Sequence, residues 1–416
     1  MDAPIERHEL VFLNPDLAGL FAAHLSHRAG VKVAIIDELK RWQSKVPDFP
    51  QAFPAEGTFR PQEVDSYATA SGFPPPTWQR LPLVEITLPE GKIALNSDGG
   101  VGGLMLAIAE PFRLGRSVLM GWLQNEITKT REHLSVGKLQ PFASLKRVET
   151  SVADSILGLH VPEPDPFIIL LDTLTILVLG RGAVQLDVRD FHHVLAHLLT
   201  GWHGPAPGDR TWAEILLRRL RKEGAHYHEV DSIAAVQSFG KRSSVVRGSD
   251  GTLHGAQLLV VPECDRFLLP LASDVSTVRW QNWHGRFAAR PDGPARLGIL
   301  RPDPKRSPVN DNFVTWRMAE APDDRFTVSA PVESRYLRGD KHETITSRIR
   351  FLLNHRYEWQ IAELKGCLAP SLGPAINLPG TAPCMSYPEG PLWGDDVLSR
   401  IRAADRLSRR ILESIK

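Results

Sequence analysis

Five residues near the N-terminus have the spacing of a site for a phosphate and a ribose. Asn14 and Asp16 form the turn after an apolar run, and Gly19 lies in the first turn of the helical stretch that follows. Asp37 and Glu38 come at the end of the next apolar run. A turn that leads into a helix presents backbone N–H groups to a pyrophosphate, and an acid about 20 residues further on binds ribose hydroxyls. The spacing therefore indicates a dinucleotide site.

The residue types in this turn depart from the usual pattern. A dinucleotide fingerprint reads G-x-G-x-x-G, whereas Asn14 and Asp16 replace its first two glycines here and only Gly19 remains. Pro15 removes a backbone donor, and a carboxylate at Asp16 would repel a pyrophosphate by roughly 1 kcal/mol at about 4 Å in water. Asp16 is also a typical helix N-cap, which would satisfy the same N–H groups. Two interpretations stay open: a unit kept for its architecture, or a site for a displaced or unusual nucleotide.

A strand–helix–strand unit is expected to position these residues. The apolar run Leu10–Leu13 predicts a short strand, and the apolar periodicity from Leu17 to Ala29 predicts a helix. Gly30 ends that helix, and Val31–Ile36 predicts a second strand. The turn and the acids then lie at the carboxyl ends of two neighbouring strands.

The rest of the chain mixes helical and strand patterns. Residues 43–80 are rich in proline and aromatic residues and are expected to form an irregular connection. The apolar run 167–179 fits a buried helix or a buried strand equally well. The other predicted elements are, in chain order, a hairpin over 81–95, helices within 99–160 and over 189–201 and 211–223, a β-rich series from Gly224 to about 335, a helix over 343–364, a loop over 366–394 and a final helix over about 395–415.

Composition excludes several classes of protein. The chain has 416 residues, of which 42% are hydrophobic and 23% charged, as in ordinary soluble globular proteins. Lysine and arginine number 49 against 48 aspartate and glutamate, which argues against a general nucleic-acid binder. The three cysteines form no C-x-x-C, and no signal peptide or transmembrane segment is evident, so a reducing cytoplasm is expected.

Histidines offer a second type of chemistry. His193 and His197 have helical i, i+4 spacing beside His192, but no glutamate completes an H-E-x-x-H motif. His226 and His228 would face one side of a strand and could hold a metal ion. Ordinary half-exposed histidines fit both patterns better, so no metal site is predicted.

Other motifs favour structural roles. The chain has no G-x-S-x-G nucleophile elbow, and the glycines of 99–103 lack the lysine of a P-loop. The basic run 218–224 fits a solvated helix face. Core packing is the expected role of three tryptophans in the β-rich region, although an apolar or stacked ligand is conceivable there: Trp280, Trp283 and Trp316.

Three blocks resemble FAD-dependent oxidoreductases of the phytoene desaturase and amine oxidase type. The first is the N-terminal unit, and the second is the block Trp212–Pro262, which leads through G-A to a strand, a D-G hairpin and a strand rich in valine. The third is the stretch 376–407, where Gly380 matches a glycine before a loop and Ser399 begins a match to S-G-x-x-A-A. Rab GDP-dissociation inhibitors have a similar fold and act by binding.

The resemblance implies an α/β protein with a discontinuous Rossmann-type FAD-like domain and an interleaved mixed-sheet α+β substrate domain. The first domain is expected over 1–80, 211–265 and 366–416, and the second over 81–210 and 266–365. If the cofactor site is retained, the resemblance places it at Asn14, Asp16, Gly19, Asp37, Glu38, Gly380 and Thr381.

The departures from the family pattern fall on its cofactor contacts. Thr381 stands where the family has the aspartate that binds the ribityl chain of the flavin. The G-G-R expected soon after the second strand is absent from the sequence DELKRWQSKVP. The sequence therefore predicts a cofactor-free binding or scaffolding protein with a protein or apolar small-molecule partner. The alternative is an FAD-dependent oxidoreductase with an atypical FAD-binding loop, for which no catalytic residue can be nominated.

Overall fold

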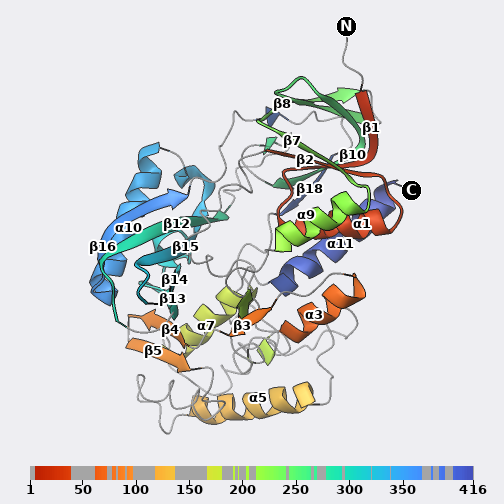
Figure 1. Cartoon of the computed structure of the whole chain (residues 1–416). Helices are drawn as coiled ribbons and strands as arrows, with labels where there is room; N and C mark the ends of the chain where they lie inside the picture. The colour runs from red at the N-terminus through yellow and green to blue at the C-terminus, as the bar shows by residue number, and fades with distance from the viewer. Residues whose placement is uncertain are drawn as a thin grey trace.

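A computed structural model provides the structure of the chain (Figure 1). Two large β-sheets organise it, and most of the helices lie against one or the other (Figure 1). The structure describes residues 5–38, 61–72, 77–80, 83–89, 91–96, 118–135, 166–179, 191–192, 195, 203–205, 212–239, 243–263, 267–268, 278–292, 296–319, 321–337, 339–367, 376–377, 384–388 and 397–415. No helix among these residues is both long and apolar enough to cross a membrane.

The first sheet has a parallel centre that carries the predicted strand–helix–strand unit. Its strand order is β7-β2-β1-β10-β9-β8, and β18 also pairs with β10. The strands β7, β2, β1, β10 and β18 are parallel, whereas β9 and β8 are antiparallel to their neighbours. The bounds are β1 Ile5–Leu13, β2 Val33–Glu38, β7 His226–Val230, β8 Ile233–Phe239, β9 Ser243–Gly248, β10 Leu253–Glu263 and β18 Cys384–Pro388.

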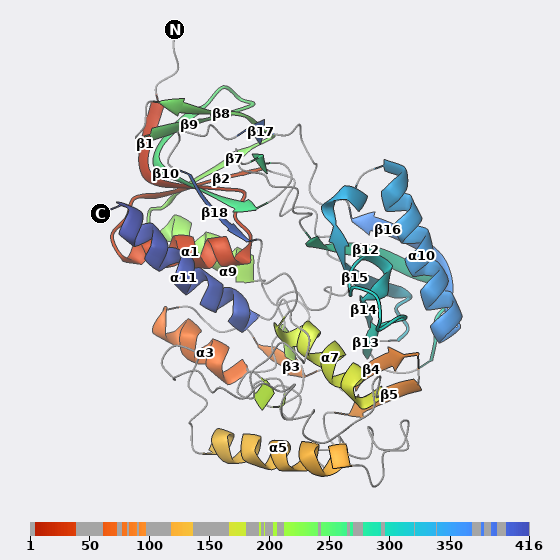
Figure 2. The same ribbon diagram turned by 180° about the vertical axis from the view of Figure 1, so that it is seen from behind.

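Three helices cover one face of this sheet, and a fourth lies beyond them. In both views α1 (Leu17–Arg28), α9 (Trp212–Lys222) and α11 (Val397–Ile415) lie side by side beneath the strands, with α3 (Pro61–Ala70) beyond them (Figure 2). Alternating residues of β1 divide between two cores, as the period of a strand requires. Leu10 and Phe12 pack against the helices, whereas Val11 and Leu13 join a second core with β8 and β9.

The second sheet is mixed and forms a separate core. Its order is β16-β12-β15-β14-β13-β4-β5, and only the β13–β4 pair is parallel. Helix α10 packs against the face that bears Trp283, Trp316 and Phe326. The bounds are β4 Leu83–Leu88, β5 Gly91–Asn96, β12 Val278–Ala289, β13 Arg296–Leu300, β14 Val314–Met318, β15 Arg325–Glu333, β16 Gln360–Cys367 and α10 Gly339–Tyr357.

The remaining described elements are short or peripheral. Helix α5 lies at the edge of the molecule far from the first sheet (Figures 1 and 2). The bounds are α5 Val118–Ser135, α7 Pro166–Leu179, β3 Trp78–Arg80, β6 His203–Pro205, β11 Phe267–Leu268, β17 Ile376–Asn377, and the 3-10 helices η3 Asn310–Asn312 and η4 Ser334–Tyr336.

Several predicted elements are confirmed. The strand–helix–strand unit, the 81–95 hairpin, the helix over 211–223, the β-rich series and the final helix are all present. The apolar run that could be a helix or a strand is the helix α7. For the predicted helices within 99–160 and 189–201, the described residues that test them are 118–135, 191, 192 and 195, which are helical.

Three predictions were wrong. The loop predicted over 366–394 contains the short strands β17 and β18, and β18 is recognisable only through its pairing with the distant strand β10. The predicted irregular connection contains α3, which buries Val64 and Ala68 against the helices of the first sheet. The helix predicted over 343–364 ends at Tyr357, and the residues after it form strand β16. Register shifts between β12 and β16 mark a bulge. Because of this bulge, Ile361 and Leu364 are both buried although they are three residues apart in a strand. That spacing mimics a helical period in the sequence.

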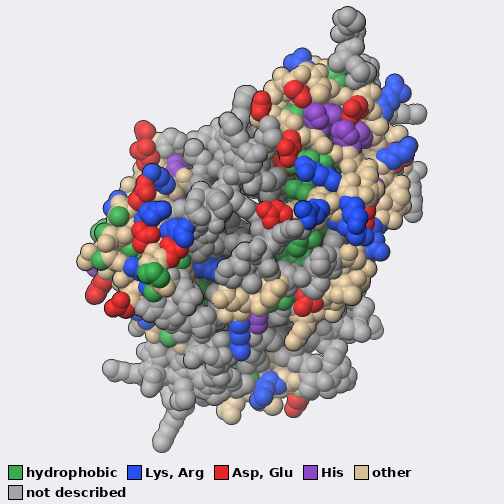
Figure 3. Space-filling model, viewed as in Figure 1, with side chains coloured by type: hydrophobic (Ala, Val, Ile, Leu, Met, Phe, Trp, Pro, Cys, Tyr) green, Lys and Arg blue, Asp and Glu red, His purple; other side chains and the backbone are tan. Residues whose placement is uncertain are grey.

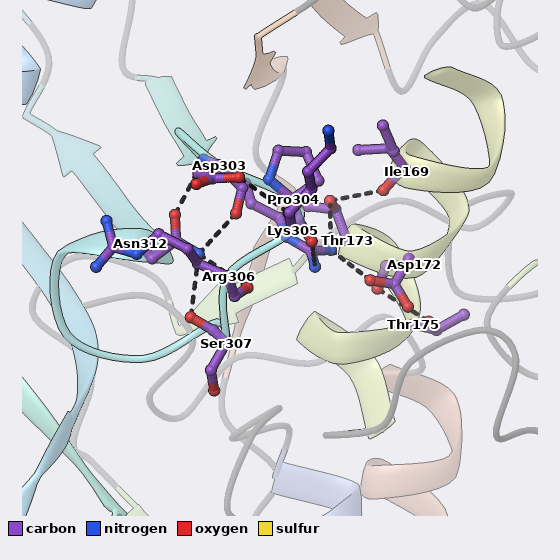
Figure 4. A network of polar contacts seen from close by, with 11 residues as sticks. Ile169, Asp172, Thr173, Thr175, Asp303, Pro304, Lys305, Arg306, Ser307 and Asn312 are labelled. Atoms are coloured by element: carbon purple, nitrogen blue, oxygen red, sulfur yellow. Dashed lines mark hydrogen bonds and ion pairs between the residues drawn. The ribbon is translucent and has the colours of Figure 1, made fainter. Parts of the chain in front are cut away.

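An ion pair explains why an acid interrupts the apolar helix α7. Arg301, at the end of β13, is 4% exposed and places its Nη1 2.5 Å from Asp172 Oδ2. The same guanidinium donates to the Thr173 hydroxyl and to the carbonyl of Pro304. Asn312 holds the following loop through the carbonyls of Asp303, Arg306 and Ser307 (Figure 4). Helix α7 is thereby joined to the loop after β13.

Buried His24 predicts a loss of stability in mild acid. Its side chain in α1 is fully buried, and this burial lowers its pKa to about 4, against the opposing effect of the Glu223 carboxylate. The unfolded chain, with a histidine pKa near 6.5, binds the proton first. We expect the free energy of unfolding to fall by up to about 3 kcal/mol as the pH is lowered from 6.5 to 4.

Urea unfolding at several pH values measures this dependence. His24→Gln is expected to reduce the slope between pH 6.5 and pH 4, because other buried histidines keep their share of it, whereas His355→Ala, which removes an exposed histidine of α10, should leave it unchanged. An unchanged slope in His24→Gln would show that other groups cause the acid sensitivity.

Candidate functional site

Hydrogen bonds between Asn14 and Glu38 join the turn after β1 to the end of β2. Asn14 has a φ of +44°, the left-handed conformation that the first fingerprint glycine usually adopts and that asparagine tolerates. Its side-chain amide donates to Glu38 Oε2 at 3.0 Å, and its side-chain oxygen accepts from the Glu38 N–H at 3.1 Å. The other oxygen, Glu38 Oε1, accepts from the N–H of Ile233 at 3.0 Å. Both carboxylate oxygens of this 5% exposed side chain are therefore bonded within the protein.

Asp16 caps helix α1, as its position in the sequence predicts. Its Oδ1 accepts from the Gly19 N–H at 2.8 Å, so the donor that would face an anion at the helix start is satisfied internally. Tyr387 donates its hydroxyl to the same Oδ1 at 3.0 Å. Arg400, from α11, places Nη1 2.5 Å from Asp16 Oδ2. We call Asp16, Tyr387 and Arg400 the helix-start cluster.

Gly19 provides the close approach expected of the third glycine. A Cβ at this position would lie 2.2 Å from the Tyr387 hydroxyl oxygen and 2.8 Å from the Pro15 Cβ. Tyr387 is 4% exposed and comes from β18, which pairs with β10. The tyrosine thus packs directly over the first turn of α1.

Sequence reasoning did not identify Tyr387 or Arg400. Arg400 follows Ser399, so it stands in place of the glycine in the S-G-x-x-A-A pattern. This replacement of a glycine by arginine near the start of a helix was the feature of the sequence that could have identified Arg400, which pairs with Asp16. Tyr387 had no comparable signal, because its place over α1 depends on the pairing of β18 with β10.

Asp37 is fully buried beside strand β7. Tyr227 donates its hydroxyl to Asp37 Oδ2 at 3.4 Å, and burial together with this carboxylate raises the pKa of Tyr227. Both acids at the end of β2 therefore contact residues of the first sheet. Gly380 and Thr381, the two other predicted cofactor contacts, lie outside the described residues.

The other predicted groups fall into different surroundings. His192 is buried and lies 2.6 Å from Glu126 Oε2 of α5, whereas His193, His197 and the glycines of 99–103 are outside the described residues. Trp283 and Trp316 are 0% and 1% exposed, which confirms their role in the core. His226 and His228 lie on β7 among further histidines.

The opposite face of the second sheet is polar near its centre. Asn282, Ser329 and Thr315 lie in one register row across β12, β15 and β14, and His284, Thr327 and Arg317 form the next. The Ser329 hydroxyl donates to Asn282 Oδ1 at 2.7 Å, and burial lowers the pKa of His284. Polar side chains therefore occupy both of these rows. The side chain of Trp280, the third of the tryptophans expected in the core, lies outside the described part of the chain.

Comparison with known proteins places the fold. No family model matches the chain, and no curated protein matches it. Among solved structures, a redesigned putrescine oxidase matches with a TM-score of 0.54 at 12% identity, covering 99% of this chain and 100% of that one. Rab GDI from Plasmodium falciparum matches with a TM-score of 0.54 at 8% identity, covering 96% and 97%. The chain has the fold of amine oxidases and Rab GDI.

A third match agrees with this assignment. Cyclohexylamine oxidase from Brevibacterium oxydans matches with a TM-score of 0.50 at 12% identity, covering 98% of this chain and 99% of that one. The resemblance inferred from three sequence blocks is confirmed at the level of the amine oxidase and GDI fold. At such identities the likeness establishes the fold and leaves function to the site.

Proposed function

We propose that this chain is a cofactor-free binding protein built on the amine oxidase and GDI fold. The observation that carries the proposal is the helix-start cluster. The Asp16 carboxylate accepts from the first-turn N–H of α1 and pairs with Arg400, so an internal anion takes the role that a pyrophosphate has in dinucleotide sites.

FAD fits this site poorly, both where its pyrophosphate would bind and where its ribose would bind. A pyrophosphate at the start of α1 would meet a carboxylate and the Tyr387 hydroxyl, and like charges repel more strongly where water is excluded. The carboxylate of Glu38, the acid suited to a ribose, already accepts two hydrogen bonds, one from the Asn14 side-chain amide and one from the Ile233 N–H. The Glu38 backbone N–H also donates to the side-chain oxygen of Asn14. Binding FAD in the usual pose would break these bonds without replacing them.

The partner we propose is a protein. Rab GDI, a GDP-dissociation inhibitor, has the same fold, and its match covers 96% of this chain. The fold is therefore compatible with a protein that acts by binding another protein. An apolar small molecule is a weaker choice, because Trp283 and Trp316 are enclosed in the core and cannot stack upon a ligand.

Titration with FAD tests the proposal. We expect the purified protein to be colourless, and calorimetry to show a Kd weaker than about 1 mM, which corresponds to about 4 kcal/mol of binding free energy. Tight FAD binding by the unmodified protein, or flavin absorbance after purification, would refute the proposal.

A variant with a restored glycine turn extends this test. Asn14→Gly combined with Asp16→Gly should recover little FAD affinity, since Tyr387 still packs on Gly19 and Arg400 remains beside the start of α1. The double variant must first be shown to be folded by circular dichroism, because Asp16 also caps the helix.

The second candidate function is an FAD-dependent oxidoreductase with an atypical loop. It is favoured by the match to putrescine oxidase over 99% of the chain and by the acids Asp37 and Glu38 at the end of β2. The same titration separates the two functions, because this candidate requires a yellow protein with FAD bound.

A further inference from the structure

Four histidines and one glutamate gather at the beginning of the parallel strands. Glu6 and His8 lie on β1, His254 lies opposite Glu6 on β10, and His226 and His228 lie on β7. Histidine side chains gather beside acidic ones over this end of the first sheet (Figure 3). The ring centroids of His8 and His226 are 5.0 Å apart, and those of His226 and His254 are 5.5 Å apart. Strand pairing thus brings together residues almost 250 positions apart.

The ligand atoms of four of these residues converge. Glu6 Oε2 lies 3.2 Å from His226 Nε2, 3.6 Å from His254 Nδ1 and 3.8 Å from His8 Nε2, and all four atoms lie within 4.8 Å of one another. Ligands about 2.0–2.2 Å from a tetrahedral zinc ion are about 3.4 Å apart. Small side-chain rotations would bring this set to that geometry.

Four of the ring nitrogens in the set make no hydrogen bond among the described residues. His8 Nε2, His226 Nε2 and both ring nitrogens of His254 are buried and make no hydrogen bond to any described residue. His254 is only 1% exposed. Neutral imidazoles have the lone pairs that metal ions require, and buried polar atoms without partners are costly otherwise.

We propose that Glu6, His8, His226 and His254 bind a divalent transition-metal ion of the zinc class. Three imidazoles and one carboxylate suit zinc, and no oxygen-rich shell of the kind that Ca²⁺ or Mg²⁺ requires is present among these four residues. The Glu6 side chain is 54% exposed, which leaves the ion a route from solvent.

Neighbouring side chains support the ligand set. The ring of His228 lies tilted against that of His254, with centroids 4.8 Å apart, and its Nε2 lies 3.0 Å from Asp250 Oδ2. Thr252 donates its hydroxyl to Asp250 Oδ1 at 2.6 Å, which holds that carboxylate in place. These contacts orient the β9–β10 turn beside the site.

The metal site is independent of the proposed function. Glu6 and Leu13 are seven residues apart on β1, or about 23 Å at 3.3 Å per residue, so the site lies at the opposite end of the strand from the helix-start cluster. An ion there would tie β1, β7 and β10 together. We therefore expect it to stabilise the fold.

Zinc binding to the metal-free protein tests the proposal. The full chain, without a polyhistidine tag, is treated with a chelator, dialysed and titrated with Zn²⁺ in a calorimeter. We expect one ion per chain, and a higher melting temperature with zinc than without it. His226→Ala and Glu6→Gln should each weaken binding by at least about 100-fold and remove the thermal shift.

The controls distinguish zinc binding at this site from nonspecific binding by surface histidines. His355→Ala removes an exposed histidine of α10 and should leave affinity and thermal shift unchanged. Glu6 and His226 are partly exposed, so both variants are expected to fold, and circular dichroism checks this. The proposal is overturned if the unmodified protein binds no zinc, or if His226→Ala and Glu6→Gln bind it as tightly as the unmodified protein does.

Discussion

Replacing Asp16 with alanine is expected to lower the free energy of unfolding by about 4 kcal/mol. The change removes the cap of helix α1, worth about 1 kcal/mol, together with the acceptor of the Tyr387 hydroxyl. It also takes the carboxylate away from Arg400, whose side chain is 13% exposed. Removing one partner of a buried ion pair typically costs about 3–5 kcal/mol.

Urea unfolding of a small variant set measures this effect. Asp16→Asn keeps an oxygen for the Gly19 N–H and should lose less, because only the ion pair is broken. The matched control is Asp405→Ala, which breaks an exposed pair with Arg409 on α11 and should cost about 0.5 kcal/mol or less. Equal losses for Asp16→Ala and Asp405→Ala would show that the helix-start cluster does not stabilise the fold.

Replacing Arg301 with alanine is expected to cost a similar amount, about 4 kcal/mol. Arg301 is 4% exposed and contacts Asp172 and Thr173 of α7 as well as the Pro304 carbonyl. Without the guanidinium, the Asp172 carboxylate loses its cation in an otherwise apolar helix. The loop after β13 also loses its attachment to α7.

A second ion pair on the same sheet provides the control. Arg286 pairs with Asp324 at 3.3 Å, but their side chains are 49% and 43% exposed. Arg286→Ala should therefore cost less than about 1 kcal/mol. If Arg301→Ala costs no more than Arg286→Ala in urea unfolding, the buried pair does not hold α7 to the sheet.

The helix-start cluster and the metal-ligand set use the two ends of one parallel sheet differently. At the carboxyl ends, the carboxylates of Asp16 and Glu38 both accept hydrogen bonds from donors within the chain. At the amino ends, the Nε2 atoms of His8 and His226 and both ring nitrogens of His254 make no hydrogen bonds among the described residues. The contrast is why we assign a ligand to the amino ends and none to the start of α1.

Sequence alone was sufficient for features that depend on neighbours along the chain. The strand–helix–strand unit follows from apolar periodicity and from Gly30, and the cap at Asp16 follows from its place before Leu17. The order of three weak blocks also predicted the amine oxidase and GDI fold. Local patterns misled at β16, where a bulge gave buried residues a helical spacing.

Tertiary structure decided the contacts that carry the two proposals. Tyr387 and Arg400 reach Asp16 across more than 370 positions, because β18 pairs with β10 and α11 packs on α1. The histidine on β10 meets Glu6 and His226 for the same reason. A parallel sheet aligns the ends of strands that are distant in the sequence, so side chains with no local pattern become one site only when the strands pair.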